Sequence, residues 1–205
     1  SHAQVREYLG ARGTGWREDA TNAEDGCQRN RLRHGVLPLL AAEMPELPLR
    51  VTHNDTKLNN VLFDRRTRKA LCVLDLDTVM PGSSLYDYGD SIRFGAATAA
   101  EDEKDLSKMG INLHLFQVYT AGYLAACKSL TPKELELLPL GAKIITLELA
   151  VRFLTDYLDG DRYFRVAYPE HNLVRARAQM KLVADMEAHW DEMQAIVAEE
   201  AAKRN

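Results

Sequence analysis

The stretch His53-Asn54-Asp55-Thr56-Lys57-Leu58-Asn59-Asn60 decides how the rest of this chain is interpreted. It is a polar segment that lies between two short apolar segments, residues 49–52 and 61–63. A third apolar segment, residues 71–74, runs directly into Asp75-Leu76-Asp77. Short apolar runs bounded by polar residues are typical of strands. The pattern therefore predicts an acidic loop between two strands and a second pair of carboxylates at the end of a third.

The spacing of these residues is that of a loop that catalyses phosphoryl transfer. Such loops follow the pattern H-x-D-x-x-x-x-N, and an Asp at the end of the next hairpin binds metal. His53, Asp55, Asn60 and Asp75 fit this pattern, whereas the alternative, a polar turn in an ordinary α+β domain, does not explain it. Carboxylates and an amide carbonyl suit Mg²⁺, which also binds substrate phosphates. We expect Asn60 and Asp75 to hold Mg²⁺ on the phosphates of ATP.

Asp55 is expected to be the main catalytic residue and to contact the substrate. An ordinary Asp has a pKa of about 3.9 and is a weak base at neutral pH. That is sufficient because the transition state of phosphoryl transfer is loose, so Asp55 orients the acceptor hydroxyl and takes its proton late. Lys57 is expected to offset charge on the transferred phosphoryl group. Asp77 is either a ligand of a second metal ion or the cap of a local turn, and His53 is expected to brace the loop.

Two segments, residues 52–57 and 75–81, are similar to motifs of known kinases. The block resembles the C-terminal lobe of the aminoglycoside phosphotransferase and choline kinase superfamily, and these two segments resemble its N-acetylhexosamine 1-kinase branch. The resemblance covers roughly residues 32–190. It implies a fold of the α+β class: a protein-kinase-like C-terminal lobe, mostly helical, with short β-hairpins around the catalytic loop. It also implies ATP as the phosphate donor and Mg²⁺ as the cofactor.

The resemblance implies roles for three residues outside the loop. In the superfamily an Asp at the position of Asp87 holds the backbone of the catalytic loop, although an Asp that opens a helix is also a common N-cap. Residues 151–164 resemble a signature segment of the hexosamine kinases, in which an Arg and a Tyr contact the sugar. Carried over, these residues are Arg152 and Tyr163, whose fork of donors and phenol suit sugar hydroxyls and an amide carbonyl.

The residues alone support a different interpretation of the same segment. Glu148, Arg152 and Asp156 follow one another at four-residue steps, which predicts a solvated row of ion pairs on a helix. The two interpretations remain open at this point. If the acceptor is an N-acetylhexosamine, the attacking group is its anomeric hydroxyl, which is more acidic than an ordinary alcohol. A weak base such as Asp55 is then still more adequate.

Helices are expected over most of the remaining chain. Residues 81–84 are predicted to form a turn, and a helix follows toward Phe94. Further helices are predicted at 28–44 and 112–127, after a capping box at Thr131 and Glu134, and in one long final helix over 170–201. The expected inward-facing residues are Leu115, Phe116, Tyr119, Tyr123 and Ala126, then Ile145, Leu149, Phe153 and Tyr157, and in the last helix Leu173, Ala176, Met180, Val183, Trp190, Met193 and Val197.

Composition limits the possible partners and the compartment. The chain has 205 residues, 46% of them hydrophobic, and a formal net charge of −4, so nothing favours nucleic acid or an anionic membrane. Cys27, Cys72 and Cys127 form no C-x-x-C pair and are typical of free thiols in a reducing compartment. No apolar run approaches the roughly 18 residues that span a bilayer. We therefore expect a cytoplasmic protein.

The domain organisation is expected to be incomplete. Residues 1–31 read as a connector or a remnant of a missing N-terminal lobe, and residues 32–205 as the catalytic and acceptor-binding lobe. A nucleotide-binding lobe of strands and a helix needs roughly 70 residues, and only 48 precede Leu49. We expect weak or no activity from this chain alone. Three hypotheses follow: a sugar 1-kinase, a kinase for another small alcohol such as an aminoglycoside, choline or homoserine, or a non-catalytic binding lobe.

Overall fold

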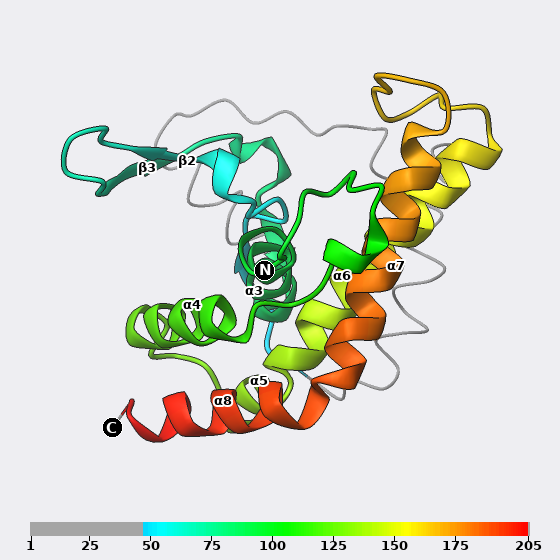
Figure 1. The fold of residues 1–205 in the computed structure, drawn as a ribbon. Helices are drawn as coiled ribbons and strands as arrows, with labels where there is room; N and C mark the ends of the chain where they lie inside the picture. Colours follow the sequence, from blue (N-terminus) through cyan, green and yellow to red (C-terminus); the bar gives the residue numbers. More distant parts are fainter. Residues whose placement is uncertain (1–46, 205) are drawn as a thin grey trace, which may run out of the picture.

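The computed structural model describes residues 47–204, which form an α+β domain that is mostly helical (Figure 1). The predictions made for residues 1–46, including the connector over 1–31 and the helix over 28–44, lie outside the described residues. Within the described part, no helix is both long and apolar enough to cross a membrane.

Four short strands form two antiparallel pairs. β1 (Arg50–Thr52) pairs with β4 (Met80–Gly82), and β2 (Val61–Phe63) pairs with β3 (Ala70–Val73). Three strands lie where the sequence placed them, but the turn expected over 81–84 was wrong, because Pro81 lies opposite Val51 in a strand. Each strand of a two-stranded sheet is an edge, and an edge tolerates a residue without an N–H.

The β2–β3 hairpin projects from the helices, and a charged turn joins its strands (Figure 1). Asp64 organises this turn, since its Oδ1 accepts the backbone N–H groups of Arg66 and Thr67. These hydrogen bonds, the one from the Thr67 amide above all, hold the pKa of Asp64 below its ordinary value. The basic residues of the turn are exposed, as expected for a solvated hairpin tip.

The helices begin close to their predicted starts, with one correction at the site. α3 (Ser84–Gly95) is capped by Ser83, whose side chain accepts the Leu85 N–H, so the interpretation of Asp87 as the N-cap was wrong. α4 (Leu113–Ala126) follows its cap Asn112. α5 (Pro132–Glu136) starts with the predicted capping box, both of whose hydrogen bonds are present. The long helix α6 (Leu138–Leu158) comes next.

The single final helix expected over 170–201 was wrong. The chain forms α7 (His171–Ala188) and α8 (Trp190–Ala202), and the backbone leaves the helical conformation at His189 (φ −106°, ψ 22°). This break turns the chain so that α7 lies along α6 while α8 runs beneath α4 and α5 (Figure 1). One straight helix could not cover both surfaces.

The core forms around α3, which lies between α4 and α6 (Figure 1). α3 and α6 approach backbone to backbone: a Cβ on Gly89 would lie 2.5 Å from Gly141 O, and a Cβ on Gly141 would lie 2.6 Å from Leu85 O. Two residues of α3, Asp90 and Arg93, are thereby held close to α6. The largest buried side chains of this core are Leu85, Tyr88, Ile92, Phe116, Leu124, Leu138, Leu182, Met186 and Met193.

On some helices the side that is buried differs from the side that the sequence predicted. α4 buries Phe116, Thr120 and Leu124, whereas Leu115 is 43% exposed. Ala126 of α4 and Met180 of α7, both predicted inward, are exposed. In an almost uniformly apolar helix such as α4, the positions of neighbouring helices decide which stripe is covered, and the sequence does not record those positions.

Candidate active site

The loop 53–60 is fixed to the start of α3 by Asp87. The carboxylate of Asp87 accepts the backbone N–H of His53 on Oδ2 and that of Asn54 on Oδ1, both at 2.8 Å. Thr56 Oγ1 also donates to the Asp87 carbonyl. Burial raises the pKa of Asp87 and outweighs the opposing effect of the two amide donors. The two amides hold the turn at Asn54, whose φ of 63° is otherwise unfavourable for a side-chain-bearing residue.

Asp55 lies in the middle of the loop, where two donors meet on one of its oxygens. Lys57 Nζ lies 2.7 Å from Asp55 Oδ2, and Asn60 Nδ2 lies 2.8 Å from the same oxygen. Burial raises the pKa of Asp55, but the hydrogen bonds from Lys57 and Asn60 and the charge of Lys57 together bring it below its ordinary value. The carboxylate is therefore ionised at neutral pH.

His53 joins the loop to the end of the β2–β3 hairpin. Its Nε2 lies 2.8 Å from the Leu74 carbonyl oxygen, so Nε2 carries the proton that is donated. Thr78 Oγ1 donates to the His53 carbonyl at 2.6 Å. Within the described residues Nδ1 of His53 is buried and has no hydrogen-bond partner. The ring thus contacts backbone and not the side chain of Asp55.

The residues predicted to hold Mg²⁺ lie at the base of the same hairpin. The backbone N–H of Leu74 donates to the carbonyl oxygen of Asn60 at 2.8 Å. Asp75 is the residue after Leu74, so its backbone lies close to that of Asn60. Asp75 is exposed, and its backbone is left-handed (φ 61°). Asp77 is exposed in the short 3-10 helix η3 (Leu76–Thr78), and no contact recorded for residues 47–204 joins its carboxylate to Asn60.

The donor set fits a magnesium ion that also binds substrate phosphates. Both side-chain contacts of Asn60 use Nδ2, which leaves its carbonyl oxygen Oδ1 as the atom for a metal. Asp75 adds an exposed carboxylate. Across the described part of the chain no group of three or more His, Cys, Asp or Glu side chains gathers as at a closed metal site. An open set of one or two carboxylates, completed by water and phosphates, is the usual magnesium arrangement.

Two adjoining cavities open beside Asp55. We call the smaller one, of about 270 Å³, the inner pocket, and the larger one, of about 640 Å³, the outer pocket. The residues that line both are Asn54, Asp55, Arg93, Leu149 and Arg152. Asp55 therefore stands in the wall that the two pockets share.

The structure brings the two predicted acceptor contacts to these cavities. Arg152 lines both pockets and Tyr163 lines the outer one. The Arg152 guanidinium lies 5.7 Å from the centre of the Tyr163 ring and 5.2 Å from that of Phe164. Arg152 Nε is 3.7 Å from Glu148 Oε1, and both side chains are mostly buried. The predicted ion pair of Glu148 and Arg152 is present, but the prediction that the row is solvated was wrong, because this side of α6 lines the pockets.

Of the three residues in the predicted row of ion pairs, Asp156 differs most from the prediction. Its side chain is only 1% exposed, and its oxygens accept the backbone N–H groups of Arg162, Tyr163 and Phe164 at 2.8–3.0 Å. Asn172 Nδ2 donates to it as well, at 2.9 Å. Asp156 thus fixes the loop between α6 and α7 that carries Tyr163. The sequence signal that could have indicated the burial of Asp156 is its position three residues after Phe153, which places both on the same side of the helix.

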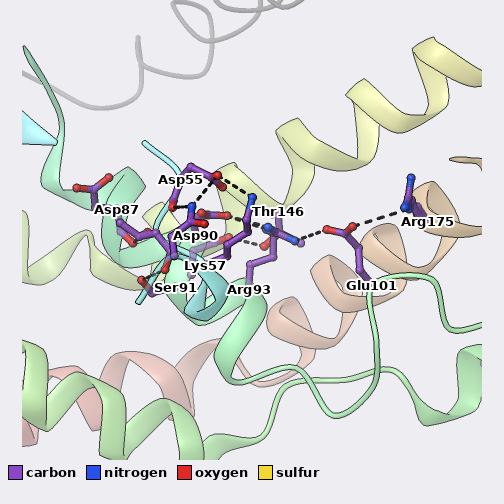
Figure 2. A network of polar contacts seen from close by, with 12 residues as sticks. Asp55, Lys57, Asp87, Asp90, Ser91, Arg93, Glu101, Thr146 and Arg175 are labelled. Carbon is purple, nitrogen blue, oxygen red and sulfur yellow. Dashed lines mark hydrogen bonds and ion pairs between the residues drawn. The ribbon is translucent and has the colours of Figure 1, made fainter. Parts of the chain in front are cut away.

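The sequence also did not predict a series of mostly buried ion pairs that begins beside Asp55, at the inner pocket. Asp90 and Arg93 of α3 form an ion pair, and Glu101 lies between Arg93 and Arg175 (Figure 2). Arg93 Nη1 is 2.7 Å from Glu101 Oε1. The spacing of Asp90 and Arg93, three residues apart just after Asp87, was the only sequence signal, and such pairs are common on solvated helices.

The family assignment agrees with this geometry. The model of the phosphotransferase enzyme family (APH) matches residues 4–113, more than half of the chain. The chain therefore belongs to the phosphotransferase enzyme family. The matched span contains the loop 53–60, both sheets and α3 with Asp87.

Individual relatives match only a short segment. The tRNA(Ile)-lysidine synthase of Solibacter usitatus is 61% identical over 41 residues, which are 20% of this chain and 9% of that enzyme. The corresponding enzyme of Nitratidesulfovibrio vulgaris is 50% identical over 42 residues, 20% of this chain and 12% of that enzyme. The chain thus matches about a tenth of the length of these curated relatives, and so short a match does not carry their activity to it.

Proposed function

We propose that this protein is an ATP-dependent phosphotransferase that phosphorylates a hydroxyl group of a small molecule, and that the acceptor is an N-acetylhexosamine attacked through its anomeric hydroxyl. The observation that carries the proposal is the position of Asp55. It is an ionised carboxylate held by Lys57 and Asn60, in the wall of two cavities, both of which Arg152 lines and the outer of which Tyr163 lines.

The residues divide the chemistry as follows. The acceptor hydroxyl donates a hydrogen bond to Asp55, which orients its oxygen and takes the proton as the phosphoryl group is transferred. Lys57 sits against Asp55 and supplies positive charge where the phosphoryl group passes. Asn60 and Asp75 would hold Mg²⁺, which when bound neutralises charge on the phosphates of ATP.

Arg152 and Tyr163 are assigned to the acceptor. A guanidinium and a phenol provide fixed donors for sugar hydroxyls and for the carbonyl of an acetamido group. Phe153 and Phe164, whose ring centres are 4.7 Å apart, add apolar surface to the outer pocket. Sugars present both hydroxyls and apolar C–H faces, so a wall of this composition suits them.

The proposal includes the organisation of the protein. We assign residues 32–205 to a catalytic and acceptor-binding lobe, and a nucleotide-binding part to the exposed side of the sheets. Leu62 and Val73 are 47% and 52% exposed on the two faces of the β2–β3 hairpin, and exposed large apolar side chains mark contact sites.

The test is ADP release with a panel of acceptors: N-acetylglucosamine, N-acetylgalactosamine, an aminoglycoside, choline and homoserine. With the nucleotide-binding part present we expect turnover with an N-acetylhexosamine and a loss of about 10²- to 10⁴-fold in kcat for Asp55→Asn, whereas residues 1–205 alone should show weak turnover or none. The control is Asp64→Asn, the same change at the exposed hairpin tip, which should leave kcat unchanged. Equal turnover by the Asp55→Asn variant would exclude the catalytic role, and turnover only with another alcohol would exclude the sugar.

A further inference from the structure

Asp90 lines the inner pocket, and only one of its two carboxylate oxygens has a hydrogen-bond partner among the described residues. Arg93 donates to Oδ1 of Asp90 from Nε at 3.0 Å and from Nη2 at 2.8 Å. The other oxygen, Oδ2, is buried and has no hydrogen-bond partner in the described part of the chain. Leaving a buried carboxylate oxygen without a donor is costly, and native proteins seldom do so. A donor from outside the chain is therefore expected at this atom.

The position of the Asp90 carboxylate is fixed by Arg93. Arg93 is only 6% exposed, and Glu101 Oε1 holds it from the other side at 2.7 Å (Figure 2). Both ends of the guanidinium are thus occupied, so Arg93 cannot swing to follow a moving carboxylate. Arg93 in turn keeps Oδ1 of Asp90 in place. Asp90 therefore presents a rigid acceptor, and rigid polar groups discriminate well between ligands.

The surroundings of Asp90 define the kind of molecule that fits. The inner pocket has a volume of about 270 Å³, and it is lined by Asp90, by Asp55, and by the apolar surfaces of Tyr86, Ile145 and Leu149. That volume is slightly below the usual range for ligand pockets, about 300–1,000 Å³, so only a small ligand fits. The carboxylates accept hydrogen bonds only, whereas Arg152 in the same lining donates only, so the pocket selects a ligand that both donates and accepts, as a hydroxyl does. A small polyhydroxylated ring, with donors at its rim and apolar C–H faces, satisfies each of these conditions.

We propose that Asp90 is a specificity-determining residue whose Oδ2 accepts a hydrogen bond from a hydroxyl of the acceptor sugar other than the one that reacts at Asp55. This inference rests on the proposed function and adds a contact at the far end of the sugar. When one hydroxyl of the sugar is bound at Asp90, the orientation of the ring limits which of its other hydroxyls can reach Asp55. A site built to receive a hydroxyl strongly rejects the analogue that lacks it, because the polar group of the protein is then left unpaired.

The first experiment needs no variant. Binding of N-acetylglucosamine and N-acetylgalactosamine to the wild-type chain is measured by calorimetry, together with single-deoxy analogues that lack one ring or exocyclic hydroxyl each. We expect one deoxy position to weaken binding about 10- to 100-fold, the usual effect of a hydrogen bond to a charged group. Equal affinity for all the deoxy analogues overturns the inference.

The second experiment changes Asp90 to Asn. The amide keeps an oxygen for Arg93 but presents an N–H₂ donor in place of Oδ2. We expect the dissociation constant for the full sugar to rise by the same 10- to 100-fold factor, while the analogue sensitive in the wild type binds the variant as tightly as the full sugar does. Asp191→Asn, the same change at an exposed position of α8, is the control for binding and for the melting temperature.

The outcomes separate this inference from the proposed function. A deoxy pattern that is present in the wild type and absent in Asp90→Asn, without phosphoryl transfer, refutes the function and supports the sugar contact. Transfer with an unchanged dissociation constant for Asp90→Asn refutes the contact and supports the function. No binding of either sugar by the wild-type chain refutes both. If Asp90→Asn does not fold, Asp90→Ser is measured in its place, and the contact is refuted if that variant still binds the sensitive deoxy analogue more weakly than the full sugar.

Discussion

Replacing Asp156 by alanine is expected to loosen the loop that positions Tyr163 in the acceptor site. Asp156 accepts three backbone N–H groups of residues 162–164 and the side-chain N–H of Asn172, all at 2.8–3.0 Å. Alanine removes every acceptor at once and leaves these four donors without a partner.

The magnitude follows from how much water can replace the carboxylate. Hydrogen bonds to a charged group contribute about 1.5–3 kcal/mol each, so four of them set an upper bound. The loop is at the surface, where Tyr163 is 51% exposed, and the released amides of residues 162–164 can bind water once the loop opens. We therefore expect a loss of about 2–4 kcal/mol in the free energy of unfolding, or roughly 5–15 °C in Tm.

The assay combines thermal unfolding with amide hydrogen exchange. The amides of residues 162–164 should exchange much faster in Asp156→Ala, and the KM for the acceptor should rise while the KM for ATP stays the same, because only the outer pocket loses its wall. Glu136→Ala is the control, since Glu136 pairs with Lys133 in an exposed ion pair worth less than about 1 kcal/mol. Wild-type exchange at residues 162–164 in the Asp156→Ala variant would show that the carboxylate does not hold the loop.

Two further predictions concern stability. The hydrogen bond from Arg50 is the main reason that the pKa of Glu134 falls from 4.5 to about 2, so this pair stabilises the fold above pH 4.5 and its contribution is lost as the pH falls toward 2. Between pH 7 and pH 3, urea unfolding should show a loss of stability that is up to about 2 kcal/mol smaller in Glu134→Gln than in the wild type, because pH 3 is still above the folded pKa of about 2. Identical losses contradict this. Gly141→Ala should destabilise by about 1–3 kcal/mol because its Cβ would meet Leu85 O at 2.6 Å, whereas Gly122→Ala, in open space on α4, should stabilise by up to about 1 kcal/mol. A Gly141→Ala variant as stable as the wild type would disprove the close approach of α3 and α6.

Local sequence was sufficient where neighbouring residues supply their own partners. The capping box of Thr131 and Glu134 satisfies its donors within four residues, and it forms as predicted. The strands β2 and β3 lie within one hairpin, so their short apolar runs and the charged turn between them were enough. The α+β class and the phosphotransferase family likewise follow from segments that are short and continuous.

The errors lie where the partner is distant in the sequence. β4 was taken as a turn because its partner β1 is 28 residues away, and Pro81 suggested a break. The final helix was taken as continuous because its apolar pattern passes through His189 without interruption, while the need to cover both α6 and α4 arises only from the arrangement of other helices.

The sequence by itself determined the spacing within the loop, which brings Lys57 and Asn60 to the same carboxylate oxygen of Asp55. Tertiary structure decided what faces them. Gly89 and Gly141 let α3 and α6 meet at backbone distance, and this contact places Asp90 and Arg93 of one helix opposite Arg152 of the other, around Asp55. The physical reason is that burial and charge pairing between distant residues depend on helix positions, which are set by packing of the whole core and not by any local pattern.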